Sequence, residues 1–260
     1  MDVLTVDADQ LAYTIDGQGP PVVLVHAGIA DHRMWDAIVP PLARTYTVIR
    51  YEMRGFGESS VPTAPFGHHQ DLRRILDYLG YETARIVGAS FGGRVVVNFA
   101  LTHPDRVHSL VLLNPPWPGY DWSAEMIAYD EAETAALAAG DLNTAVQVNL
   151  DMWLRGPVRG RADVRPGLVG ELEEALRISL MNMEIVDRYE EGVAGDIGSI
   201  AAPTLVGIGL LDVPDFRAIA HRYATEIPAA ELIEFDDAAH LIAMDSPESL
   251  VATLQKFLPR

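Results

Sequence analysis

The chain has 260 residues and a formal net charge of −18, with 37 acidic residues against 19 lysines and arginines. This length allows one domain with or without an insertion, and 49% hydrophobic with 22% charged residues is typical of a globular protein. The negative charge disfavours nucleic acid and anionic membrane surfaces as partners, and the absence of cysteine excludes disulfides, thiolate nucleophiles and Cys-ligated metals.

The N-terminal segment 1–7 has no basic stretch followed by a long apolar run, so no signal peptide is expected. No run of about 18 uncharged apolar residues occurs, so no transmembrane helix is expected either. We therefore expect a cytoplasmic protein that acts on a small molecule. The sequence carries no indication of its oligomeric state.

Strand-like and helix-like segments alternate over most of the chain. Short apolar runs predict strands at 3–6, 11–15, 22–25, 47–51, 84–87, 107–113, 204–208 and 231–235. Helical spacing of apolar residues predicts helices between them at 35–43, 69–79, 93–101, 216–225 and 247–258. Repeated strand–helix units predict an α/β fold, with a mostly parallel eight-stranded sheet and helices on both faces.

The pattern changes between residues 119 and 196, where strand signals vanish and helical stretches cover 124–137, 142–154 and 168–183. We therefore predict a core of residues 1–118 and 197–260 and a helical cap inserted as residues 119–196. The insertion should lie at the carboxyl edge of the sheet, where open α/β sheets bind ligands. It carries sixteen acidic residues against six arginines, a charge that should discourage polyanionic substrates.

The segment 88–92, Gly-Ala-Ser-Phe-Gly, reads G-x-S-x-G between a predicted strand and a predicted helix. This context predicts a sharp turn that presents the hydroxyl of Ser90 as a nucleophile. Gly88 and Gly92 fit such a turn because side chains two positions from the strained serine would crowd it.

A serine hydroxyl needs a base that takes its proton, and the base needs a group that holds it. Among eight histidines, His240 stands out because it follows the last predicted strand, at the same sheet edge as Ser90. Asp212 follows the preceding strand at this edge, with room before His240 for one helix and one strand. The order Ser90, Asp212, His240 therefore predicts a catalytic triad, with Asp215 as the alternative acid.

Acyl transfer also needs two preset N–H donors that bind the oxyanion. The residue after the nucleophile, Phe91, should supply one of them. The loop 26–30 after the third strand should supply the other from Gly28, with Ile29 as the alternative donor. His26 in this loop is expected to order the chain rather than to react.

These motifs resemble those of the α/β-hydrolase fold family, in particular its serine-esterase, enol-lactonase and perhydrolase members. The resemblance spans nearly all of the chain. Besides 88–93, it is carried by His26-Ala27-Gly28 with Trp35 (H-G-x…W), 54–59 (R-G-x-G-x-S), 209–212 and 239–248. Ala27 stands where the family usually has glycine. Glu52 stands where an aspartate usually precedes the R-G-x-G loop, and we expect this change to be structural.

The resemblance implies a serine carboxylic-ester hydrolase without cofactor or metal. Its substrate would be an ester or lactone of a small, largely uncharged molecule, cleaved through an acyl-enzyme on Ser90. Serine at this turn argues against the Asp-nucleophile dehalogenases and epoxide hydrolases, and the lack of cysteine argues against the Cys-type dienelactone hydrolases. Cleavage of C–C bonds in ring-fission products and perhydrolysis use the same triad and stay open, as does a non-catalytic ligand receptor on this fold.

The insertion should select the substrate. We expect Trp153, together with Ile29 and Leu241, to line the substrate pocket. Arginines between 155 and 165 could bind one carboxylate, as an enol-lactonase acting on a dicarboxylic-acid lactone would need. The alternative for this arginine cluster is an exposed basic loop.

Overall fold

The structure is a computed structural model that describes residues 1–157 and 167–259. Within these residues, one sheet contains β1 (Asp2–Val6), β2 (Asp9–Asp16), β3 (Pro21–Val25), β4 (Thr47–Tyr51), β5 (Ala84–Ala89), β6 (Val107–Leu113), β7 (Thr204–Gly209) and β8 (Ala230–Phe235). Their spatial order is β1-β2-β4-β3-β5-β6-β7-β8. The pairs β1–β2 and β2–β4 are antiparallel and the others parallel, which confirms the predicted α/β fold with a mostly parallel eight-stranded sheet.

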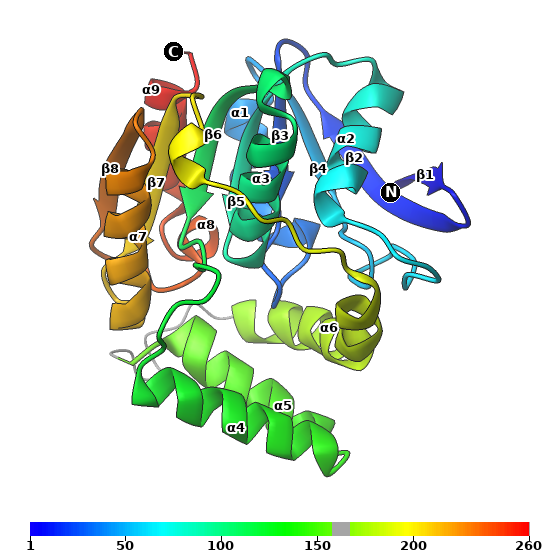
Figure 1. Cartoon of the computed structure of the whole chain (residues 1–260), viewed down its shortest axis with the longest axis vertical. Helices are drawn as coiled ribbons and strands as arrows, with labels where there is room; N and C mark the ends of the chain where they lie inside the picture. The colour runs from blue at the N-terminus through cyan, green and yellow to red at the C-terminus, as the bar shows by residue number, and fades with distance from the viewer. Residues whose placement is uncertain (158–166, 260) are drawn as a thin grey trace.

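The central strands are continuous apolar runs because helices cover both faces of the sheet (Figure 1). Alternate residues of a strand point to opposite faces, so Val22 and Leu24 of β3 pack in one buried cluster and Val23 and Val25 in another. The first cluster includes α1 (Val39–Leu42) and α9 (Pro247–Phe257). The second includes α2 (His68–Leu79), α3 (Phe91–Thr102) and α7 (Pro214–Glu226).

The prediction of a single helix at 35–43 was wrong. The chain instead forms a 3₁₀ helix, η1 (His32–Trp35), and then the short α1, in which prolines 40 and 41 occupy the first turn. Proline lacks the N–H that a helix interior needs, so a helix that contains two of them has to start just before them. A second short helix, α8 (Ile242–Asp245), precedes α9 and was not predicted.

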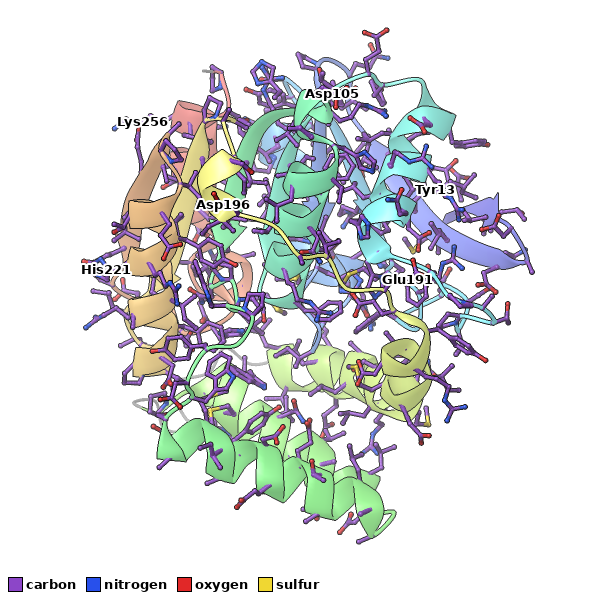
Figure 2. All side chains as sticks on the ribbon, in the orientation of Figure 1. Tyr13, Asp105, Glu191, Asp196, His221 and Lys256 are labelled. Atoms are coloured by element: carbon purple, nitrogen blue, oxygen red, sulfur yellow. The ribbon has the colours of Figure 1, made fainter. Side chains whose placement is uncertain are left out.

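Between β6 and β7 the described chain forms the helices α4 (Ala124–Ala138), α5 (Leu142–Asn149), the π-helix η3 (Leu150–Arg155) and α6 (Leu168–Tyr189). Figure 1 shows α4, α5 and α6 as a layer across the edge where the parallel strands end. Glu191 and Asp196 mark the segment that returns the chain over α3 to the 3₁₀ helix η5 (Ile197–Ser199) and β7 (Figure 2). No helix in the described ranges is long and apolar enough to span a membrane.

Candidate active site

Ser90 forms the turn between the end of β5 and the start of α3. Its backbone has φ 50° and ψ −118°, a conformation that residues with a side chain rarely adopt. Its N–H donates to the carbonyl oxygen of Leu113 at the end of β6, at 2.8 Å. A strained serine that is held in this way by the surrounding structure is typical of a functional site.

Gly88 and Gly92 are required because three segments of backbone meet at this turn. A Cβ atom on Gly88 would lie 2.4 Å from the carbonyl oxygen of Gly92. A Cβ atom on Gly92 would lie 2.5 Å from the carbonyl oxygens of Val25 and His26, at the end of β3. The two glycines therefore allow α3 to start against β5 and β3. The nearest backbone atoms that a side chain at either position would meet belong to α3 and the end of β3 rather than to Ser90.

Three loops at the carboxyl edge of the sheet bring Ser90, His240 and Asp212 together. The Ser90 hydroxyl oxygen lies 2.8 Å from Nε2 of His240, and Nδ1 of His240 lies 2.7 Å from Oδ2 of Asp212. If the Nδ1–H donates to the carboxylate, Nε2 is left to accept from the serine hydroxyl. The imidazole and the carboxylate are both almost fully buried.

Asp215, the alternative acid, lies elsewhere. Its Oδ1 accepts a hydrogen bond from the N–H of Ser123 at 2.8 Å, just before α4. Asp215 therefore connects the start of α7 to the helical layer. Asp212 uses its second oxygen, Oδ1, to accept the N–H of Val213 at 2.7 Å, which fixes the orientation of its carboxylate.

Two aromatic rings pack against the imidazole of His240. The ring of Trp153, from η3, lies 4.4 Å from it between centroids, and that of Phe216, from α7, lies 4.6 Å from it. The indole N–H of Trp153 donates to the hydroxyl of Tyr129 at 2.9 Å, and that hydroxyl donates to Asn149 at 2.8 Å. Trp153, the first predicted pocket residue, thus lies against the candidate base, and a hydrogen-bond chain within the helical layer holds it there.

The predicted oxyanion loop approaches the serine turn closely. A Cβ atom on Gly28 would lie 3.2 Å from Cβ of Phe91, so glycine allows this loop to pack beside the start of α3. No described residue accepts a hydrogen bond from the N–H of Gly28 or that of Phe91. Both predicted N–H donors therefore have no hydrogen-bond acceptor among the described residues.

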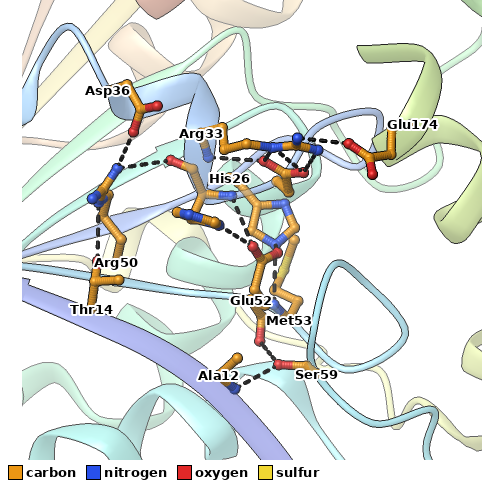
Figure 3. A network of polar contacts seen from close by, with 12 residues as sticks. Ala12, Thr14, His26, Arg33, Asp36, Arg50, Glu52, Met53, Ser59 and Glu174 are labelled. Atoms are coloured by element: carbon orange, nitrogen blue, oxygen red, sulfur yellow. Dashed lines mark hydrogen bonds and ion pairs between the residues drawn. The ribbon is translucent and has the colours of Figure 1, made fainter. Parts of the chain in front are cut away.

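His26 orders this loop through both ring nitrogens. Nδ1 donates to the carbonyl oxygen of Ala27 at 2.8 Å. Nε2 accepts from the N–H of Met53 at 3.0 Å, as Figure 3 shows. The buried carboxylate of Glu52 contacts Nδ1 of His32 through Oε1, and its Oε2 lies 3.7 Å from Nε2 of His26. This network ties the loop after β3 to the loop after β4.

Asp31, His32 and Glu52 are the one group of described side chains that could approach a metal ion, with ligand atoms within 4.8 Å of one another. Both oxygens of Asp31 accept hydrogen bonds from Arg33. Burial raises the pKa of the Asp31 carboxyl, but these hydrogen bonds lower it more, so that the pKa lies below its ordinary value. Since Glu52 contacts His32 as well, the three form part of a closed structural network. Arg33 also reaches Glu174 of α6 at 2.7 Å, which connects the network to the helical layer.

The other two predicted pocket residues, Ile29 and Leu241, lie within the packed interior. Ile29 is partly buried and packs against both apolar clusters, and Leu241 has no exposed surface. Within the predicted arginine cluster, Arg155 forms an ion pair with Asp151. The remaining members, which lie outside the described residues, are Arg159, Arg161 and Arg165.

A cavity of about 490 Å³ borders Phe91, between α3 and the end of α6. Arg94 lines it and donates to Glu190 at 2.6 Å, and Asp187 lies beside them. Burial raises the pKa values of both carboxyls, Glu190 and Asp187, above their ordinary range. The ion pair with Glu190 nevertheless compensates the positive charge of Arg94, so this cavity offers little attraction to an anion.

Asn114, which directly follows β6, was not among the predicted site residues. Its side chain is fully buried and binds the main chain of the loops that carry Asp212 and His240. A signal was available, since a polar residue at the carboxyl end of a central parallel strand lies at the edge where ligands bind.

The sequence and the fold both match known hydrolases. The family model described as alpha/beta hydrolase fold matches residues 20–143. A pimeloyl-[acyl-carrier protein] methyl ester esterase of Aeromonas hydrophila subsp. hydrophila is 26% identical over 259 residues, 93% of this chain and 96% of that protein. Two other curated relatives are 36% and 31% identical, but the chain spans only 36% and 39% of their lengths.

The fold is similar to that of solved structures over the whole chain. A hydrolase from Pseudomonas aeruginosa PA01 superposes with a TM-score of 0.82 at 29% identity and covers 100% of this chain and 98% of its own. The enol-lactonase from Burkholderia xenovorans LB400 has a TM-score of 0.83 at 24% identity, with 100% of both chains covered, and so shares the fold. From its sheet, its serine turn and these matches, the chain has the α/β-hydrolase fold, and the proteins similar to it in sequence or structure include esterases and a lactonase.

Proposed function

We propose that the protein is a serine hydrolase that cleaves a carboxylic ester or lactone of a small, largely uncharged molecule. The observation that carries this proposal is the continuous series of contacts from the Ser90 hydroxyl through His240 to Asp212, at 2.8 and 2.7 Å. Nucleophile, base and orienting acid are within hydrogen-bond reach of one another at a strained turn, which is the arrangement that acyl transfer requires.

In the first half-reaction, Nε2 of His240 takes the proton of Ser90 while the serine oxygen attacks the carbonyl carbon. The carboxylate of Asp212 stabilises the imidazolium that forms. The N–H groups of Phe91 and Gly28 would bind the oxyanion, because neither is used by another described residue. The imidazolium then gives its proton to the leaving alcohol oxygen, and the acyl group stays on Ser90.

In the second half-reaction, water attacks the acyl-enzyme. His240 takes a proton from this water and later returns one to the serine oxygen, which releases the carboxylic acid. The π-helix that carries Trp153 places an aromatic ring over the imidazole, and this ring would exclude bulk water from the base.

The substrate class follows from charge and shape. We propose that residues 119–196 act as a cap, and their net negative charge together with the compensated Arg94 favours a neutral ligand. Aromatic rings from Trp153 and Phe216 beside the base favour an apolar acyl or alcohol group. The names of a methyl ester esterase and an enol-lactonase among the similar proteins support an ester or lactone bond.

A panel of p-nitrophenyl esters with varied acyl length, together with several lactones, tests the proposal. Wild type should hydrolyse part of the panel, and Ser90→Ala should lower kcat by about 10⁶-fold, because the other two residues cannot act without the nucleophile. Ring-fission dienoates and acetate with peroxide belong in the same panel, since C–C hydrolysis and perhydrolysis would use the same three residues.

Ser109→Ala is a matched control. Ser109 is fully buried in β6, and its hydroxyl has no hydrogen-bond partner among the described residues. Its replacement should leave kcat and KM unchanged. The proposal is wrong if Ser90→Ala hydrolyses the preferred ester within tenfold of the wild-type rate.

A further inference from the structure

The carboxyl end of β6 lies between the loops that carry the proposed triad. Leu113, the last residue of the strand, accepts the N–H of Ser90 at 2.8 Å. The next residue, Asn114, donates its own N–H to the carbonyl oxygen of Gly207 in β7 at 2.9 Å. The main chain at this point therefore connects the serine turn to the strand that leads to Asp212.

The side chain of Asn114 makes the remaining connections. Its amide nitrogen donates to the main-chain oxygens of Ala239 at 3.1 Å and His240 at 2.7 Å. Its amide oxygen accepts the N–H of Gly209 at 3.1 Å. One fully buried amide thus binds the loop after β8 and the end of β7 at the same time.

The end of β7 and the loop after β8 approach each other closely through their main chains. A Cβ atom on Gly209 would lie 2.2 Å from the carbonyl oxygen of Ala239 and 2.5 Å from that of Ala238. The N–H of Leu211 also donates to the oxygen of Ala238, at 2.9 Å. The amide of Asn114, at the end of β6, binds the main chain on both sides of this contact.

Asparagine suits this position for two physical reasons. The backbone of Asn114 has φ 45°, and asparagine tolerates this left-handed region better than other residues with a side chain. Its amide supplies two N–H donors and one oxygen acceptor, which match the two carbonyl groups and one N–H group around it. An aspartate would have the same shape but no donors at neutral pH.

We propose that Asn114 is a positioning residue that holds the backbone of His240 at the distance from Asp212 and Ser90 that proton transfer needs. This inference rests on the proposed function. It assigns Asn114 a role in turnover through His240, without contact with the substrate.

Asn114→Asp tests the proposal because it keeps the shape and removes both donated hydrogen bonds. We expect kcat for the preferred ester to fall about 10²-fold, as small misplacement of a catalytic group can cause, with KM changed less than threefold. The downfield proton resonance of the His240 Nδ1–H in its hydrogen bond to Asp212, measured by NMR in the free enzyme, should shift or broaden.

Val111→Ala on the same strand is the control for lost stability, since Val111 is fully buried away from these loops. It should lower Tm without changing kcat or the resonance. If Asn114→Asp does not fold, Asn114→Gly removes the side chain and relieves the positive φ, and it should show the same kcat loss.

Wild-type kcat and an unshifted resonance in a folded Asn114 variant would overturn the proposal. Failure of the proposed function would look different. In that case Ser90→Ala would retain activity, while the resonance of the His240–Asp212 contact would still report whether Asn114 positions the histidine.

Discussion

Acid should destabilise this protein through His68, the first residue of α2. Its side chain is 1% exposed, and neither ring nitrogen has a hydrogen-bond partner among the described residues. The rings of Phe66 and Phe91 lie 4.8 and 5.4 Å from it between centroids. Burial, with the nearby charge of Arg94 as a second cause, holds the pKa of His68 well below its ordinary value.

The direction of the effect follows from proton binding. Below the unfolded pKa of about 6.5, the unfolded chain protonates His68 while the folded protein does not. The free energy of unfolding therefore decreases as the pH falls through 6.5 toward the folded pKa. For a histidine that stays neutral when folded, the loss between pH 7.5 and pH 5.5 is about 1.4 kcal/mol.

His68→Phe removes this contribution. The new ring has a similar shape and would pack among existing phenylalanines, and two buried polar atoms without partners disappear. We expect the variant to be about 1 kcal/mol more stable than wild type at pH 7.5. The gain should be larger by about 1.4 kcal/mol at pH 5.5.

Urea denaturation of wild type and His68→Phe at the two pH values measures this difference. Burial also lowers the pKa values of other histidines, and these contribute equally to both proteins, namely His69, His103 and His108. His221→Gln is the matched control, since this side chain is exposed on α7 (Figure 2). An equal stability gain at both pH values would refute the reasoning, because it would mean that His68 titrates in the folded protein as it does in the unfolded chain.

Two further predictions concern the helical layer and the core. Trp153→Ala should lower kcat/KM for the preferred ester about tenfold by removing the ring against the base, whereas Trp153→Phe keeps a ring and loses only the hydrogen bond to Tyr129. Equal losses in the two variants would contradict this role of the ring. Asp71→Asn should lower the free energy of unfolding by about 3 kcal/mol in urea denaturation, because the buried guanidinium of Arg54 donates to both oxygens of Asp71 at 2.8 and 2.9 Å. A loss below about 1 kcal/mol would show that the remaining ion pair with Asp9 suffices.

The strands were predictable because a strand that is buried on both faces is a nearly continuous apolar run in the sequence. Residues 47–51 and 107–113 were predicted with the bounds that β4 and β6 have. Helices were less predictable where a local feature competed with periodicity. The spacing of residues 142–154 predicts one helix, but the α-helix changes to a π-helix at Leu150. The π-helix ends before Gly156, which has φ 66°.

The candidate site was predictable as far as chain order and sheet edge determine it. Ser90, Asp212 and His240 each follow a parallel strand, and carboxyl ends of parallel strands lie at one edge, so their proximity follows from the pattern. The position of Asn114 at this edge was a signal as well, but its partners are main-chain atoms 95 to 126 positions away, so the sequence does not show which groups its side chain binds. The catalytic roles of the three residues stay a proposal that the serine variant tests.

The sequence alone determined the order of strands and helices, the serine turn and the candidates for base and acid, because these depend on neighbours a few positions apart. Only the tertiary structure decided that Asp212 rather than Asp215 contacts His240, that Trp153 covers the imidazole, and that Gly88 and Gly92 are required by backbone contacts. Each of these facts depends on distances between distant segments. Such distances arise when the sheet and the helices pack, so they cannot be derived from the spacing of residues along the chain.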